Sequence, residues 1–124
     1  MSYATFRTFR NTGKVNHELT KVGDYTFDSK AEAGRYIELM AMQKSGIISD
    51  LVIQPRFEII PAQEIQGHRN FQAAHYTADF QYTRDGKMVV EDVKSEYTRQ
   101  AKDYILRRKL MMFVNGIYVE EVIR

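Results

Sequence analysis

The chain has 124 residues, a formal net charge of +2 and no cysteine. This length suits one ordinary domain, and the lack of thiolates excludes disulfides and cysteine-based zinc sites. The chain contains no apolar run of about 18 residues and no apolar leader after Met1, so we expect no membrane span and no secretory signal. These features fit a protein of the reducing cytoplasm.

The positive charge gathers in two segments. Residues 1–14 carry three basic side chains and no acid, and residues 98–113 carry five basic side chains against one acid. A polyanionic partner explains such clusters, and so does a solvated helix face. Residues 1–16 show no periodicity, so we expect an N-terminal arm, either flexible or ordered, ahead of a single domain over residues 17–124.

The first predicted elements are a hairpin and a helix. Residues 20–27 predict a short hairpin that turns at Gly23-Asp24. A helix is predicted over residues 29–45, because Ser29-Lys30-Ala31-Glu32 fits the Ser-x-x-Glu capping box. Gly46 is a typical residue at which such a helix ends.

Extended segments follow this helix. Residues 51–60 predict one strand, which Pro55 makes an edge strand or a bulged strand. Residues 61–73 predict a polar loop or an extended hairpin. Residues 75–83 alternate in polarity and predict a second strand with four side chains on one face. These four are Tyr76, Ala78, Phe80 and Tyr82.

The last elements complete an α/β domain. Asp85-Gly86 predicts a two-residue hairpin turn, and residues 88–94 predict the returning strand. Residues 97–114 predict a second helix that ends at Asn115-Gly116, and residues 117–123 a final strand. The predicted order is α-β-β-β-α-β, with an antiparallel hairpin and then a helix crossing to one more strand. We therefore expect a mixed sheet flanked by helices.

The predicted hairpin brings two acids together. If Arg84 pairs with Lys87 across the turn, Asp79 lies opposite Asp92, and Lys94 shares the face of Asp92. Directly opposed like charges destabilise a sheet unless a cation bridges them or one carboxyl stays protonated. Ordinary ion pairs at an exposed hairpin end are the alternative, and a one-residue change in register would separate the acids. Glu91 faces the other way, in a structural or solvent-facing position.

A metal held here would be bound by oxygen. The three histidines, at positions 17, 68 and 75, lack metal-ligand spacing, so Mg²⁺ or Mn²⁺ is the ion expected. A lysine beside such an ion could orient the attacking water or stabilise charge on a phosphate. The arrangement suits metal-assisted hydrolysis of a phosphodiester.

These residues carry a resemblance to a known superfamily. Asp79, followed on the next strand by Asp92-Val93-Lys94, resembles the bipartite motif of PD-(D/E)XK nucleases, and the element order is similar to their restriction-endonuclease-like core. Three phrases further resemble a family of small phage proteins in that superfamily, over about residues 20–123. They are Phe27-Asp28-Ser29-Lys30-Ala31-Glu32-Ala33, Gln54-Pro55-Arg56-Phe57 and Val90-Glu91-Asp92-Val93-Lys94.

The resemblance implies roles for particular residues. Asp79 and Asp92 would bind the metal with Glu32 from the first helix, and Lys94 would be the catalytic lysine. Glu32 is also the acid of the predicted capping box, which is the alternative explanation for its presence. Ala78 stands where the motif has proline, and Asp92 is one methylene shorter than glutamate. The side chains implied in DNA binding are Arg107, Arg108, Lys109, Gln54 and Arg56.

The resemblance implies a metal-dependent DNA endonuclease of phage recombination or DNA processing, with branched DNA such as a Holliday junction as one substrate. A homodimer in the host bacterial cytoplasm is implied with it. One alternative is a catalytically silent nuclease-fold protein that binds nucleic acid or a host protein. Another is a small structural protein whose hairpin end is merely charged.

Overall fold

The computed structural model describes residues 19–124, and the predicted N-terminal arm over residues 1–16 lies outside them. The chain divides into two compact units between Leu51 and Val52, and strand β3 (Ser49–Ile53) spans this division. Within the described part of the chain, neither helix has the length and apolar character needed to cross a bilayer. The expectation of one domain over residues 17–124 stays a prediction.

The first unit holds the predicted hairpin and helix. Strands β1 (Thr20–Val22) and β2 (Tyr25–Phe27) pair antiparallel around Gly23-Asp24, and helix α2 covers Lys30–Lys44. The hydroxyl of Ser29 accepts a hydrogen bond of 3.1 Å from the backbone N–H of Glu32, as the capping box requires. The rings of Tyr25, Phe27 and Tyr36 pack together and join α2 to the hairpin. The predicted hairpin and helix are confirmed.

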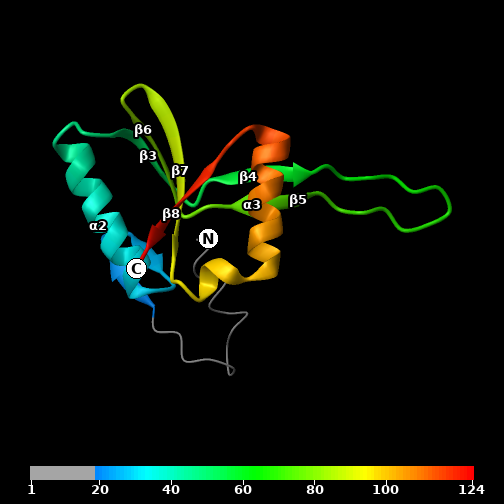
Figure 1. Cartoon of the computed structure of the whole chain (residues 1–124), viewed down its shortest axis with the longest axis horizontal. Coiled ribbons are helices and arrows are strands. Elements are labelled where there is room, and N and C mark those ends of the chain that lie inside the picture. The colour runs from blue at the N-terminus through cyan, green and yellow to red at the C-terminus, as the bar shows by residue number, and fades with distance from the viewer. Residues whose placement is uncertain (1–18) are drawn as a thin grey trace. The chain divides into compact units, whose positions relative to one another are not determined.

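The predicted strand over residues 51–60 is wrong as a single element. The chain breaks at Gln54-Pro55, and β4 (Arg56–Ile60) is a separate strand that pairs with β5 (Ala74–Thr77). Gln54 adopts a left-handed φ of 54° just before Pro55, which cannot donate a ladder hydrogen bond, and the extended backbone is interrupted there. Residues 61–73 extend from this pair as a hairpin-like arm, drawn in green in Figure 1.

The predicted strand over residues 75–83 also divides. It stops at Thr77, and β6 (Phe80–Arg84) begins after Ala78-Asp79. Tyr76, Ala78, Phe80 and Tyr82 are all buried, as the alternation predicts. They do not share one face, however, because the break separates Tyr76 and Ala78 from Phe80 and Tyr82.

A mixed sheet is formed around β7 (Lys87–Lys94). Strand β6 pairs with it antiparallel, and the register runs from Arg84↔Lys87 through Gln81↔Val90 to Phe80↔Glu91. Asp85 and Gly86 have φ values of 51° and 75°, which a two-residue type I′ turn requires. Strand β8 (Val119–Ile123) lies parallel to β7 on its other side. The predicted turn, register and mixed sheet are confirmed.

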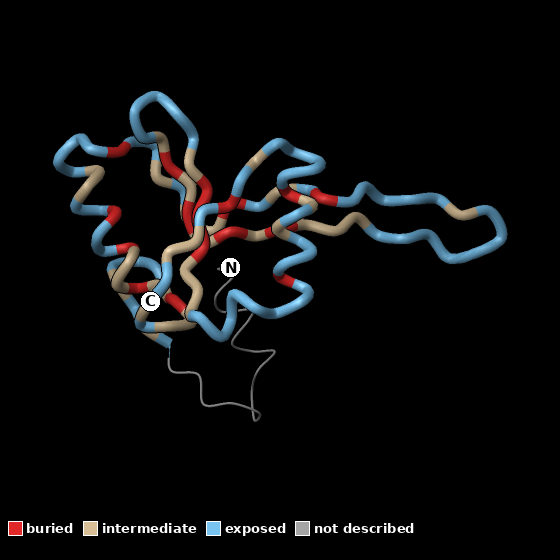
Figure 2. The backbone as a smooth tube through the Cα atoms, viewed as in Figure 1, coloured by how far each residue is buried: buried red, intermediate tan, exposed pale blue. Residues whose placement is uncertain are grey.

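Helix α3 (Lys102–Asn115) connects β7 to β8 and is shorter than predicted. Residues 98–100 form a 3₁₀ turn instead, and Ala101 is extended, so the α-helix begins only after it. Gly116 ends the helix in the left-handed conformation, as predicted. One face of α3 packs against β4, β5 and β8 (Figure 1). The buried core cluster of this unit consists of Ile59, Tyr76, Ala78, Val90, Tyr104, Met111 and Val119. Figure 2 shows by colour where the chain is buried.

Candidate active site

The break between β5 and β6 places Asp79 beside Asp92. The β6–β7 ladder ends at Phe80↔Glu91, and Asp79 is the next residue along. Its backbone N–H lies 2.8 Å from Oδ1 of Asp92, and its own Oδ2 accepts a hydrogen bond of 2.8 Å from the backbone N–H of Val93. Each carboxylate therefore binds the backbone of the opposite strand, and the two acids are neighbours, as the predicted register implies.

Tyr76 holds the second oxygen of Asp92. Its hydroxyl donates a hydrogen bond to Oδ2 of Asp92, and the two side chains belong to residues that are only 2% and 4% exposed. Burial, and then the negative charge of Asp92 and the hydrogen bond to it, raise the pKa of Tyr76 above its ordinary value. Tyr76 therefore stays protonated and fixes the orientation of the Asp92 carboxylate.

Glu91 lies on the opposite face of β7. It is 1% exposed, and its Oε2 accepts a hydrogen bond of 2.8 Å from the hydroxyl of Tyr82. The solvent-facing alternative for Glu91 is therefore wrong, whereas a structural position fits its burial. Because Tyr76 and Tyr82 contact adjacent residues of β7, the two tyrosines serve opposite faces of the sheet.

Lys94 lies at the end of β7, on the face of Asp92. Its Nζ is 4.2 Å from the centroid of the Tyr104 ring, a distance at which an ammonium group is attracted by the π face. Lys94 and Tyr104 line a pocket of about 360 Å³ together with Arg107. This pocket is open to solvent and is lined by two cations and one acid, Asp103, so its lining carries a net positive charge that could attract an anionic group.

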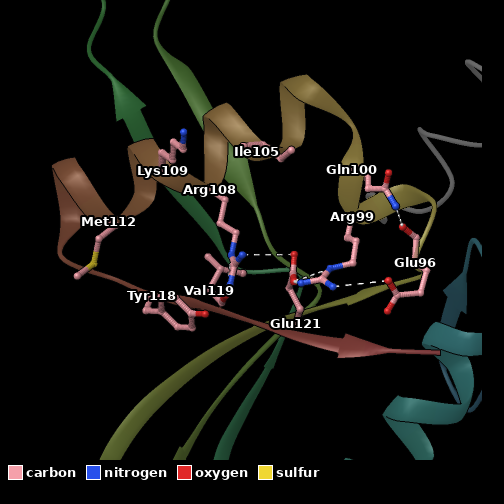
Figure 3. A pocket seen from close by; sticks show the side chains of 10 residues that line it. All are labelled: Glu96, Arg99, Gln100, Ile105, Arg108, Lys109, Met112, Tyr118, Val119 and Glu121. Carbon is pink, nitrogen blue, oxygen red and sulfur yellow. Dashed lines mark hydrogen bonds and ion pairs between the residues drawn. The ribbon is translucent and has the colours of Figure 1, made fainter.

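Tyr104 connects the Lys94 region to a second cluster of charges. Its hydroxyl donates a hydrogen bond of 2.7 Å to Oε2 of Glu121, whose side chain is 8% exposed. Arg99 and Arg108 approach the same carboxylate at 2.8 Å and 3.4 Å (Figure 3). Burial alone raises the pKa of Glu121, but the hydrogen bond from Tyr104 and the two guanidinium groups outweigh it, so that this pKa lies below its ordinary value.

The three successive basic residues of α3 point to different places. Arg107 lines the pocket of Lys94 and forms a 3.4 Å ion pair with Asp103. Arg108 turns instead to Glu121 and donates a hydrogen bond of 2.9 Å to the carbonyl of Val119. Arg108 and Lys109 line a separate pocket of about 490 Å³ (Figure 3). Of the three, Arg107 is the one that shares a pocket with Lys94.

Gln54 and Arg56 lie on either side of the strand break. The backbone N–H of Gln54 donates a hydrogen bond of 2.9 Å to the carbonyl of Asp79, so Gln54 directly supports the segment that carries this acid. Arg56 is exposed and lies 3.2 Å from Nδ1 of His75. Gln54 follows the end of β3 and Arg56 begins β4, so the two residues do not belong to one strand.

The donor set at Asp79 and Asp92 fits Mg²⁺ or Mn²⁺, because both ions prefer carboxylate oxygens and Mg²⁺ commonly uses one or two carboxylates. Among residues 19–124, no three His, Cys, Asp or Glu side chains form a group that could hold a metal. Glu32 lies in the first turn of α2, in the first unit. Its assignment as a third ligand stays a prediction.

Three residues of this region were not predicted as site residues. Tyr76 belongs to a run of alternating aromatic residues and has no distinguishing local signal. Tyr104 and Glu121 lie on α3 and β8, and only the packing of these two elements brings them together. A parallel strand after a basic helix predicts proximity of the elements but not the contact of these side chains.

A family model described as "Protein of unknown function (DUF1064)" matches residues 11–120, which is most of the chain. No curated protein and no solved structure matches the chain.

Proposed function

We propose that this chain, which belongs to the family described as "Protein of unknown function (DUF1064)", is a metal-dependent DNA endonuclease of the PD-(D/E)XK type. The observation that supports this proposal is the contact of Asp79 with Asp92, with Lys94 two residues further along the strand of Asp92. Mg²⁺ or Mn²⁺, when bound, would polarise the scissile phosphate and favour ionisation of a water.

The chain's own residues have distinct tasks in this proposal. Asp79 and Asp92 hold the cation, and their orientation is maintained by the backbone N–H of Val93 and by Tyr76. Lys94 presents its ammonium group to the phosphate, where it neutralises negative charge. Arg107 in the same pocket adds a second cation for the DNA backbone.

We also propose that the chain has a restriction-endonuclease-like core. Leaving out the β1–β2 and β4–β5 pairs and the 3₁₀ turn, elements α2, β3, β6, β7, α3 and β8 follow one another in the order α-β-β-β-α-β. That order is the one expected of a restriction-endonuclease-like core. We include in the proposal a homodimer that acts on DNA in phage recombination or processing within the bacterial cytoplasm, because the sequence resembles small phage nucleases.

The test is cleavage of supercoiled, linear and branched DNA in Mg²⁺ or Mn²⁺. Lys94→Ala and Asp92→Asn should each lower the rate by about 10²–10⁴-fold, while their circular dichroism spectra stay native. Lys87→Ala is the matched control, because Lys87 is an exposed lysine at the other end of the same strand. Activity that survives both site substitutions would contradict the assignment.

The comparison of branched with linear DNA decides the substrate. Faster cutting of a four-way junction supports a resolvase, whereas equal rates support general processing. Binding without cutting under either metal would favour the alternative of a catalytically silent nuclease-fold protein. Unfolding of Asp92→Asn would favour a purely structural carboxylate.

A further inference from the structure

The arm formed by residues 61–73 is the feature that the proposed catalytic residues do not explain. It continues from β4 and β5 and projects away from helix α3 (Figure 1). Residues 61–72 are all exposed except Ile65, which is partly exposed (Figure 2). No part of the buried core described for the second unit comes from this segment.

The arm nevertheless has a defined backbone. Gln63 and Phe71 exchange two backbone hydrogen bonds of 2.9 Å. Nearer the tip, the side chain of Asn70 accepts a hydrogen bond of 3.2 Å from the N–H of Ile65, and Gly67 turns the chain with a φ of 78°. A two-stranded ribbon without a core is marginally stable in water, because little burial offsets its conformational entropy. Such an element is best explained by a partner that covers it.

The dimensions of the arm suit the major groove of duplex DNA. Six residues separate Ile60 from Gly67 on one side, so the arm reaches about 20 Å from the strands that carry it. The major groove is about 8.5 Å deep and admits a two-stranded ribbon. The arm is therefore long enough for its tip to reach the base edges.

The side chains of the arm have the chemistry that reads base edges. Gln66 lies within the turn that a hydrogen bond from His68 to Ile65 closes, and Arg69 follows it. Amide and guanidinium groups are those that bind adenine and guanine bidentately. Glu64 is the one acid among residues 61–73, which limits repulsion by phosphates. A second copy of this chain is a poorer occupant, since Phe71, at 59% exposure, is the one large apolar side chain of the arm that is exposed. The other amides along the arm are Gln63, Asn70 and Gln72.

We propose that the arm over residues 61–73 enters the major groove of duplex DNA and reads base edges with Gln66 and Arg69 at its tip. The inference rests on the proposed function for the choice of DNA as the substrate. It adds a sequence- or duplex-selecting element that is separate from Asp79, Asp92 and Lys94.

The decisive variant replaces residues 64–70 by Asn-Gly. Gln63 and Phe71 form a hydrogen-bonded pair, and a two-residue turn connects residues that pair in this way. Asp85-Gly86 connects Arg84 to Lys87 by such a turn in this protein. Binding to a 30-base-pair duplex library is measured by anisotropy in EDTA, where no cleavage occurs. The shortened chain should bind at least about tenfold more weakly, with an unchanged circular dichroism spectrum. Unchanged affinity, or an affinity loss explained by a change of oligomeric state, would overturn the proposal.

Point variants separate base reading from charge. Arg69→Ala and Gln66→Ala should reduce the preference among selected sequences by about 5- to 150-fold per bidentate contact. Arg84→Ala is the control, since it removes an exposed arginine at the tip of the other hairpin. If Arg69→Ala weakens all sequences equally, the arm contacts only phosphates and base reading is refuted. If the shortened chain does not fold, the point variants Arg69→Ala and Gln66→Ala still test the proposal.

The two proposals fail in different ways. Arm-dependent DNA binding without any cleavage in Mg²⁺ or Mn²⁺ would contradict the nuclease but support the arm. Cleavage that depends on Lys94 but is unaffected by the arm variants, in both rate and sequence preference, would do the opposite. A wild-type chain that binds no duplex DNA would refute the arm as a groove reader.

Discussion

Asp92 accepts a hydrogen bond of 2.8 Å from the backbone N–H of Asp79, so two acidic residues are held side by side where the β6–β7 ladder ends. The contact is reciprocal, because Asp79 accepts a hydrogen bond from Val93 on the strand of Asp92. Backbone hydrogen bonds fix both side chains, but they leave each carboxylate near another negative charge. Such an arrangement is stabilised when a cation binds between the acids.

Divalent ions should therefore stabilise the folded chain. At a Mg²⁺ or Mn²⁺ concentration 100 times the Kd, the free energy of unfolding should rise by about 2.7 kcal/mol, because the ion binds only the folded site. Urea denaturation with and without the ion measures this. Asp79→Asn should remove the effect, whereas Asp103→Asn, at an exposed acid on α3, should preserve it. An equal response of both variants would indicate nonspecific ion binding.

Tyr76→Phe should weaken metal binding as well as folding. The substitution keeps the buried ring and removes the hydroxyl that orients Asp92, which should cost about 1.5–3 kcal/mol of unfolding free energy. Tyr82→Phe is a matched control, since it removes the corresponding hydrogen bond to Glu91 on the other face. Both variants should lose similar stability in urea, but calorimetric titration with Mn²⁺ should show a weaker Kd for Tyr76→Phe alone. Equal metal affinities would assign Tyr76 to stability only.

The Tyr104 ring should matter more to cleavage than its hydroxyl. Tyr104→Phe keeps the π face 4.2 Å from Lys94 and removes the hydrogen bond to Glu121, whereas Tyr104→Leu removes both. A partly solvated cation–π contact is worth about 0.5–1 kcal/mol, so the leucine variant should cut DNA about two- to fivefold more slowly than the phenylalanine variant. Single-turnover cleavage measures the difference. Equal rates would show that the ring does not position Lys94.

Glu121 should make stability depend on acid pH. Its pKa is lowered in the folded chain, so its ion pairs stabilise the fold fully above the ordinary glutamate pKa of about 4.3. This contribution is lost as the pH falls through the lower, folded-state pKa. Glu121→Gln should cost about 1 kcal/mol at pH 7, a modest value because Arg99 and Arg108 are partly solvated.

The difference between wild type and Glu121→Gln should shrink progressively as the solution is acidified from about pH 5 toward pH 2. Urea denaturation at successive pH values follows this change. Glu120→Gln is the control, because Glu120 is the exposed neighbour on β8. A constant difference across this range would show that the charge of Glu121 does not contribute to folding.

Features that depend on neighbouring residues were predictable from the sequence. Ser29 marks a helix start because its hydroxyl accepts a hydrogen bond from the backbone N–H of Glu32, three residues further along. Asp85-Gly86 marks a turn because both residue types tolerate a positive φ. Once that turn is known, the residue pairs of the hairpin can be counted back from Arg84 and Lys87, and the count predicts that Asp79 and Asp92 are neighbours. The candidate acids could therefore be found without the fold.

Other features were decided only by the tertiary structure. Alternating polarity predicts that side chains share one face of a sheet only where the strand is continuous. The chain is interrupted at Gln54-Pro55 and at Ala78-Asp79, so side chains before and after each break do not share a face. Tyr76 thus reaches Asp92, whereas Tyr82 reaches Glu91. The burial of Glu91 and the contacts of Tyr104 with Lys94 and Glu121 likewise depend on which elements cover β7. The sequence alone determined the local turn, the helix start and the candidate acids, whereas the packing of separate elements determined which side chains contact those acids, because these contacts join residues far apart in the chain.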